Sequence, residues 1–141
     1  MFKIFKLILI CATIVLFLLK FGYANEEKIK IGLLVPMSGE KNKLGQSIIK
    51  STRLALKDIG TNNMEIYPRD TGLDPNKTLQ SAIELKKLGV KIIIGPVFFE
   101  NIKYLSEVKD IIFLSLTNKT NGLPNNVISS GVNSVSQLNA I

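Results

Sequence analysis

Short apolar runs alternate with longer amphipathic segments along most of this chain. Ile29–Val35 and Met64–Tyr67 have the length and apolar content of strands, and they stop at Pro36 and Pro68. Between them, Leu44–Ile59 carries apolar residues at a spacing of three and four, which is typical of a helix with one buried face. The first half of the chain therefore predicts a strand, a helix and a second strand.

The next segment has clear signals at both ends. Asp74 and Pro75 are preferred at the N-cap and at the first position of a helix, because aspartate accepts backbone N–H groups and proline has a suitable φ. Gly89 is a typical residue just after a helix, since it adopts positive φ freely. Val90–Ile94 follows as a nearly continuous apolar run. We expect a helix and then a strand covered on both faces.

The last third continues the alternation. Glu100–Lys109 has apolar residues at helical spacing, Ile111–Leu116 and Val127–Ser130 are strand-like, and a capping-box pattern at Ser134–Gln137 announces a further helix. Strands alternating with helices predict an α/β fold, a three-layer αβα, doubly wound and mostly parallel sheet. The last helix would have only about two turns, so we expect an incomplete fold.

The first residues have the three-part pattern of a secretory signal. Met1–Lys6 carries two lysines, Leu7–Leu19 is an apolar run of 13 residues, and the small residues Gly22 and Ala24 precede Asn25. We expect cleavage between Ala24 and Asn25 and export to the periplasm. The alternative is an uncleaved anchor, although a membrane span needs about 20 apolar residues.

This cleavage defines a signal peptide of residues 1–24 and a mature domain of residues 25–141, with no stable transmembrane span remaining. Cys11 lies inside the apolar run and not at its end, so we interpret it as an apolar residue and not as a lipid-attachment site. The mature domain then has no cysteine, which suits an exported protein that does not depend on disulfides.

Composition excludes several kinds of chemistry. The chain has no histidine and one cysteine, so catalytic triads with histidine, internal disulfides and histidine- or cysteine-based metal sites are excluded. We expect no cofactor, no metal and no enzyme activity. The net charge of +7 becomes +4 once the three leader lysines are removed, which leaves 15 basic and 11 acidic residues. Because these charges are interspersed, we expect no nucleic-acid binding.

Polar residues gather in the loops that should follow the strands. In open parallel sheets ligands bind at the carboxyl ends of strands. Hydroxyls, short amides and free backbone N–H groups there suit a small polar or anionic ligand, although such residues also serve as ordinary turn and cap residues. The candidate binding residues are Ser38, Gly39, Asp70, Gly95, Pro96, Glu100, Ser115, Thr117 and Asn118.

A nucleotide site is not supported by the glycine pair in the first loop. Five residues separate Gly39 from Gly45, where a P-loop has four, and Gln46 occupies the position of the essential lysine. Asp70 and Asp74 could form a carboxylate pair for hydrolysis, but Asp74 is better explained as a helix cap. A carboxylate-based hydrolase is therefore the least favoured hypothesis.

Several segments in order resemble a known family. Lys30–Gly39 and Leu44–Gln46 are similar to the opening of type I periplasmic binding proteins of the leucine-binding kind. Pro68–Gly72, Gly95–Phe98 and Leu114–Asn118 follow in that family's order and spacing. Pro-Arg-Asp-Thr-Gly together with Gly-Pro-Val-Phe most resembles the penicillin-binding protein activator branch.

The resemblance implies a two-lobed clamshell about two to three times this length, of which the chain would cover the N-terminal lobe. Ser38 and Thr117 match positions that contact ligand in amino-acid-binding relatives. Two departures agree better with the activator branch. Phe98–Glu100 replaces a serine-rich stretch, and Leu44 replaces a bulky aromatic residue.

The leading hypothesis is a non-catalytic periplasmic protein that regulates peptidoglycan synthesis through contact with a peptidoglycan synthase, a penicillin-binding protein. The alternative is a solute-binding component of an ABC transporter for branched-chain or other amino acids, with an ABC permease as partner.

Overall fold

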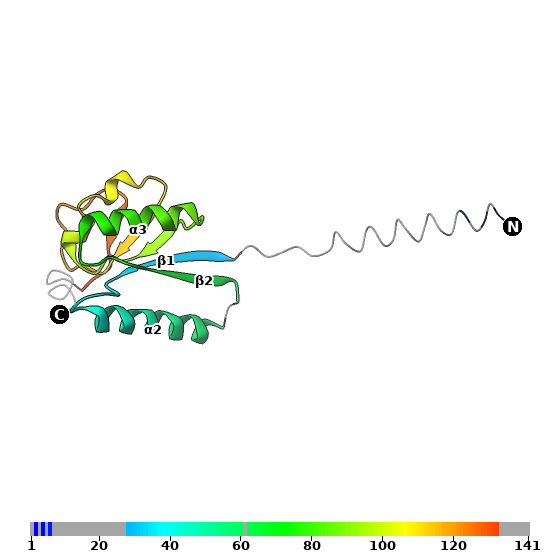
Figure 1. Cartoon of the computed structure of the whole chain (residues 1–141), viewed down its shortest axis with the longest axis horizontal. Coiled ribbons are helices and arrows are strands. Elements are labelled where there is room, and N and C mark those ends of the chain that lie inside the picture. Colours follow the sequence, from blue (N-terminus) through cyan, green and yellow to red (C-terminus); the bar gives the residue numbers. More distant parts are fainter. Residues whose placement is uncertain (1, 3, 5, 7–27, 61, 133–141) are drawn as a thin grey trace, which may run out of the picture.

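The structure, a computed structural model, describes residues 2, 4, 6, 28–60 and 62–132. Figure 1 shows the strands and helices in these ranges. The strands form one parallel sheet in the order β2-β1-β3-β4-β5. They are β1 (Ile29–Val35), β2 (Met64–Asp70), β3 (Ile92–Ile94), β4 (Ile112–Ser115) and β5 (Val127–Ser129). The α-helices are α2 (Asn42–Ile59) and α3 (Pro75–Lys87), and two 3₁₀ turns are η1 (Phe99–Ile102) and η2 (Leu105–Glu107).

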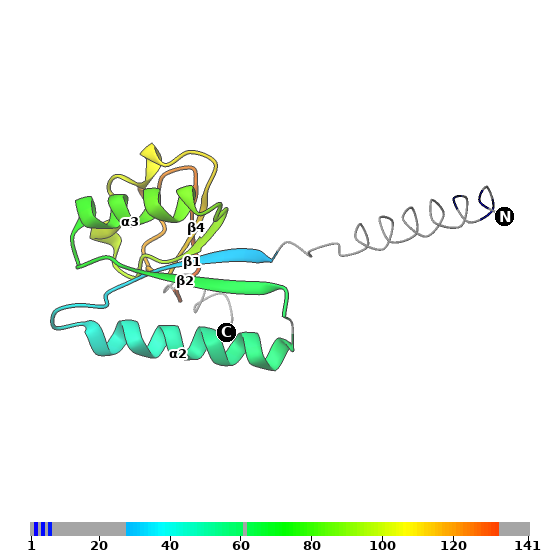
Figure 2. The same ribbon diagram turned by 45° about the vertical axis from the view of Figure 1, so that its right-hand side comes forward.

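Helices α2 and α3 lie on opposite faces of the sheet, as Figure 2 shows. The larger core packs α3 and the 3₁₀ turns on one face around Leu34, Leu85, Ile93 and Phe113. The smaller core packs α2 on the other face around Leu33, Val35 and Ile49. The predicted α/β class, the three layers and the parallel sheet are confirmed.

Strand β3 is covered fully on one face and only in part on the other by the described residues. Ile93 is fully buried in the larger core, whereas Ile92 is 40% exposed. On the same face, Ile112 of β4 and Ile128 of β5 are 49% and 53% exposed, because α2 lies over β1 and β2. Within residues 28–132 the second face of β3 is therefore covered only at Ile94, which packs against the α2 core, so the expected cover on both faces is met only in part.

The predicted helix over Glu100–Lys109 is instead the pair of 3₁₀ turns η1 and η2. Its buried apolar residues Ile102, Leu105 and Val108 recur every third position. This period matches a 3₁₀ helix with three residues per turn better than an α-helix with 3.6. The side-chain amide of Asn126 also donates to the carbonyls of Leu105 and Val108, at 2.9 and 3.1 Å, which an α-helix would use internally.

Strand β2 does not end at Pro68 but continues to Asp70. Pro68 pairs in register with Leu33 of β1, and β2 is the edge strand of the sheet. Proline lacks an N–H group, and an edge strand tolerates it where that group would point away from the neighbouring strand. Pro68 therefore does not end the strand, because β2 lies at an edge of the sheet.

Both predicted ends of α3 are confirmed. The carboxylate of Asp74 accepts a hydrogen bond from the Lys77 backbone N–H at 2.7 Å. At the other end, the N–H groups of Gly89 and Val90 donate to the carbonyls of Lys86 and Leu85. Gly89 has a φ of 85°, so this is a Schellman motif. The predicted cleavage residues Ala24 and Asn25 and the predicted helix at Ser134–Gln137 lie outside the described residues.

Candidate functional site

Asp70 links the loops that follow β1 and β2. Its Oδ1 accepts hydrogen bonds from the backbone N–H groups of Met37 and Gly72, at 2.7 and 2.9 Å. Its Oδ2 accepts from the Ser38 hydroxyl and from the Lys77 ammonium, both at 2.6 Å. Four donors from two loops and from helix α3 therefore surround one carboxylate.

These contacts determine the charge of Asp70. Burial acts to raise its pKa, but hydrogen bonds from Lys77, Ser38, Gly72 and Met37 outweigh burial, and the pKa lies well below the usual range of a carboxyl group. Asp70 is thus ionised at neutral pH and its acceptor sites are occupied. A group in this state stabilises the loops and is poorly suited to act as a general acid or base.

A second cluster joins the loops after β3 and β4. The Ser115 hydroxyl is fully buried and donates to the Pro96 carbonyl at 2.9 Å. The Thr117 hydroxyl is 5% exposed and accepts from the Lys119 backbone N–H at 3.2 Å. The Ser129 hydroxyl donates to the Thr117 carbonyl at 2.7 Å. The hydroxyls of this cluster are therefore engaged with the backbone of the loops.

Gly95 and Pro96 bring the loop after β3 against β1. The peptide bond between them is cis, and Gly95 has a φ of 106°. A Cβ atom at Gly95 would lie 2.2 Å from the Leu34 carbonyl oxygen. Only glycine fits this position, because both the backbone angle and the close approach exclude a side chain.

A pocket of about 610 Å³ lies beside these loops, between the start of α3, η1 and the loop that joins β4 to β5. Its lining combines apolar rings and chains with three charged groups: Pro75, Phe99, Glu100, Ile102, Lys103, Lys119, Gly122 and Pro124. The Lys119 ammonium lies 4.5 Å from the centroid of the Phe99 ring, a cation–π distance. The pocket therefore presents an apolar surface together with two ammonium groups and one carboxylate.

The structure brings together some of the predicted binding residues and separates others. Ser38 contacts Asp70, and Pro96 contacts Ser115, whereas Gly39 and Asn118 are exposed at the surface. Glu100 is the predicted residue that lines the pocket. Sequence reasoning missed Phe99, Lys103 and Lys119, although the aromatic residues after Gly95-Pro96 were a visible departure from polar loops.

Two further findings concern the described residues. In this part of the chain, no group of three or more histidine, cysteine, aspartate or glutamate residues is placed to hold a metal ion. Among the same residues, no helix has the length and hydropathy to cross a membrane.

Comparison with known proteins agrees with this architecture. Residues 28–140 match a family described as periplasmic binding protein. The C-domain of LpoA (YraM) from Haemophilus influenzae, a regulator of PBP1A, is 23% identical with a TM-score of 0.58, over 73% of this chain and 32% of that chain. The leucine-binding protein LivK from Thermotoga maritima is 18% identical with a TM-score of 0.60, over 70% and 31%.

A third similar structure is a solute-binding protein from R. palustris in complex with 4-hydroxybenzoate. It is 21% identical with a TM-score of 0.62, over 72% of this chain and 31% of that chain. No curated protein matches the chain significantly. The chain thus spans about a third of the length of these structures, and at such identities the likeness concerns the fold.

Proposed function

The chain belongs to the periplasmic binding protein family, and we propose that it serves as a non-catalytic regulator of peptidoglycan synthesis that contacts a penicillin-binding protein. The structural likeness to the C-domain of LpoA, a regulator of PBP1A, supports this proposal. The motif resemblance to the penicillin-binding protein activator branch points in the same direction. The protein would act in the periplasm after export.

One observation favours the regulatory function over amino-acid binding. Three of the candidate polar side chains at the carboxyl edge of the sheet are already occupied within the chain, although the buried Thr71 hydroxyl beside them has no hydrogen-bond partner among the described residues. Asp70 accepts from four donors, and the hydroxyls of Ser38 and Ser115 donate to Asp70 and to the Pro96 carbonyl. A small amino acid needs free donors and acceptors, and taking them here would break the hydrogen bonds that Asp70 and Ser115 already make. A surface contact needs no such exchange.

The pocket favours a second candidate function, solute binding. Phe99, Lys103 and Lys119 offer an aromatic ring and two cations, which suit a small aromatic carboxylate. The similar solute-binding protein from R. palustris was crystallised with 4-hydroxybenzoate. In this case the protein would deliver its ligand to an ABC permease.

Two assays on the full chain separate the candidates. In the first, tagged protein is incubated with purified peptidoglycan synthases from the same organism, and retention together with a changed synthase rate supports the regulator. In the second, thermal unfolding is followed with amino acids and with hydroxybenzoates. A ligand at about 100 times its Kd adds about 2.7 kcal/mol to the stability.

Lys119→Ala provides the variant for both assays, with Lys43→Ala as the control on an exposed lysine outside the pocket. Loss of ligand stabilisation in Lys119→Ala alone supports solute binding at the pocket. Retention of a synthase without any ligand effect supports regulation. If no synthase is retained and a solute stabilises the protein, the regulator proposal is wrong.

A further inference from the structure

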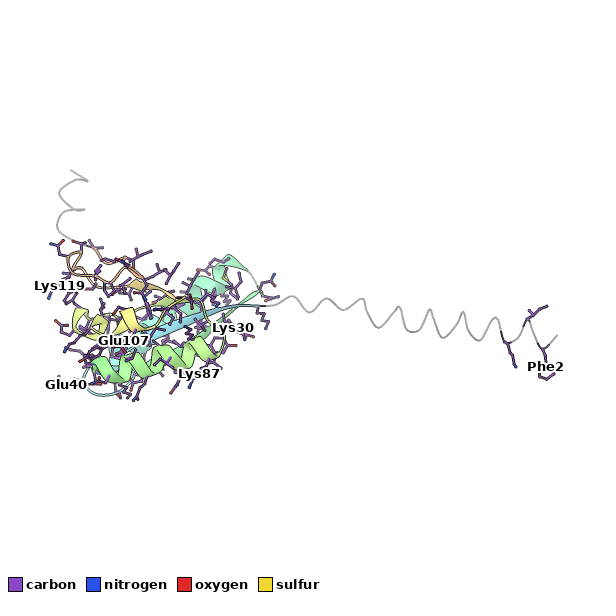
Figure 3. All side chains as sticks on the ribbon, turned by 90° about the horizontal axis from the view of Figure 1, so that it is seen from above. Phe2, Lys30, Glu40, Lys87, Glu107 and Lys119 are labelled. Atoms are coloured by element: carbon purple, nitrogen blue, oxygen red, sulfur yellow. The ribbon has the colours of Figure 1, made fainter. Side chains whose placement is uncertain are left out.

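Lysines collect at the amino edge of the sheet, the end opposite the candidate site. Lys28 and Lys30 lie at the start of β1, Lys91 immediately precedes β3, and Lys87 ends α3. We call these four residues the basic edge. Figure 3 shows Lys30 and Lys87 toward this end of the molecule, and Glu40 and Lys119 at the other. The edge does not belong to the site described above.

The basic edge combines charge with exposed apolar surface. Three of its lysines line a hollow of about 270 Å³ together with Ile29, Gly89 and Ile92. Ile29 and Ile92 are 51% and 40% exposed, and they lie at the starts of two adjacent strands. An apolar rim beside several ammonium groups suits the boundary between lipid headgroups and acyl chains better than it suits a purely polar partner.

Only two of the four lysines of the basic edge have side chains that make contacts within the described part of the chain. Lys28 pairs with Glu65 at 2.7 Å, and Lys30 donates to the Leu88 carbonyl at 3.0 Å, near the end of α3. Within the described part of the chain, the side chains of Lys87 and Lys91 make no hydrogen bond or ion pair, and both residues are exposed. These two ammonium groups are therefore free to meet an external anion.

The position of the basic edge in the sequence indicates the kind of anion that it binds. Lys28 comes nine positions after Leu19, the last residue of the apolar run. If this run acts as the predicted leader, it enters the membrane during export, and the amino edge of the sheet is the part of the domain that follows it most directly. We infer that the basic edge docks on the anionic phospholipid headgroups of that membrane. The inference is independent of the proposed regulatory function, but it rests on the predicted leader, and its test uses protein from which the leader has been removed.

Flotation with lipid vesicles tests the inference on the full protein as purified after export. The vesicles contain phosphatidylcholine alone or phosphatidylcholine mixed with phosphatidylglycerol. The test variant is Lys87→Gln combined with Lys91→Gln. The control combines Lys41→Gln with Lys43→Gln, two exposed lysines near the carboxyl edge that make no side-chain contact in the described residues.

We expect the wild-type protein to prefer the anionic vesicles, and we expect the partition coefficient of the test variant on them to be about 25-fold lower. Each lysine near an anionic surface contributes about a factor of five. The control should bind as the wild type does, and salt at about 1 M should abolish the preference because the screening length falls to about 3 Å.

Three outcomes overturn the inference. The first is equal binding of wild-type protein to neutral and anionic vesicles, which would assign membrane contact to apolar residues alone. The second is an equal loss in the test and control variants, which would indicate non-specific attraction by total charge. The third is competition by single-stranded DNA as strong as that by anionic lipid, which would point to a polyanion site.

Discussion

Asp70 shows how one residue can organise a binding edge without itself being available for binding. Its carboxylate is held by two backbone N–H groups, one hydroxyl and one ammonium. The sequence marked Asp70 as a candidate site residue because aspartate follows a strand. It could not reveal that Lys77, seven positions later on α3, and Ser38 on another loop would occupy both oxygens. Such contacts depend on how distant segments meet.

Replacement of Asp70 by asparagine should destabilise the protein by about 2 to 3 kcal/mol. An amide has one uncharged acceptor oxygen instead of two charged ones. If that oxygen keeps the two backbone N–H groups, the amide NH2 group faces the Lys77 ammonium, which loses its partner. Chemical denaturation followed by circular dichroism measures this change. Asp58→Asn, at an exposed position near the end of α2, is the matched control and should change stability little. A loss of the same size in both variants would contradict the role given to Asp70.

The same residue predicts how stability depends on pH. The pKa of Asp70 is lowered in the folded state, so its contribution is present above the unfolded pKa of about 3.9 and disappears as the pH falls toward the folded pKa. The melting temperature of the wild type should therefore fall between about pH 5 and pH 2 more steeply than that of Asp70→Asn. Parallel melting curves for the two proteins over this range would exclude Asp70 as the cause.

At the scale of elements, the sequence predicted those features that depend on residues close together in the chain. The N-cap at Asp74 and the Schellman end at Gly89 depend on neighbouring residues, and both were predictable. The extension of β2 through Pro68 depends on its place at the sheet edge, which topology decides. The 3₁₀ turns have a local signal in the three-residue period of their buried side chains, but the bonds from Asn126, about twenty positions away, could not be predicted from the segment itself.

Asn126→Ala tests the origin of the two 3₁₀ turns. In this variant the carbonyls of Leu105 and Val108 each lose one hydrogen-bond donor. We expect a loss of about 1 to 3 kcal/mol in unfolding free energy, measured by denaturant titration. Asn125→Ala changes the exposed neighbour and should have little effect. Hydrogen exchange around η2 should increase in Asn126→Ala only, and an unchanged exchange rate would contradict the proposed support.

For the whole molecule, the alternation of strands and helices was enough to predict the α/β class, the parallel sheet and, through the resemblance, the family. The site was less predictable, because its loops follow four different strands and their polar groups form hydrogen bonds with one another. The pocket itself is formed by α3, η1 and the loop before β5. Its residues are too far apart in the chain for any spacing rule to join them.

The leader prediction concerns the whole chain and can be tested by mass. The chain of 141 residues has a mass of 15.6 kDa. Cleavage before Asn25 leaves 117 residues, about 13 kDa at roughly 110 Da each, in the periplasmic fraction of an exporting host. Ala24→Lys should block cleavage and keep the full mass, because signal peptidase requires a small residue there.

The control for this measurement is Ala12→Lys, which interrupts the apolar run itself. This variant should fail to be exported and should keep the full mass in the cytoplasm, whereas Ala24→Lys should be exported but remain tied to the membrane by an uncut leader. The two variants thus separate the export function of the run from the cleavage site. Wild-type protein that keeps its full mass at the membrane would show that the leader is an anchor, and would hold the basic edge permanently beside the lipid surface.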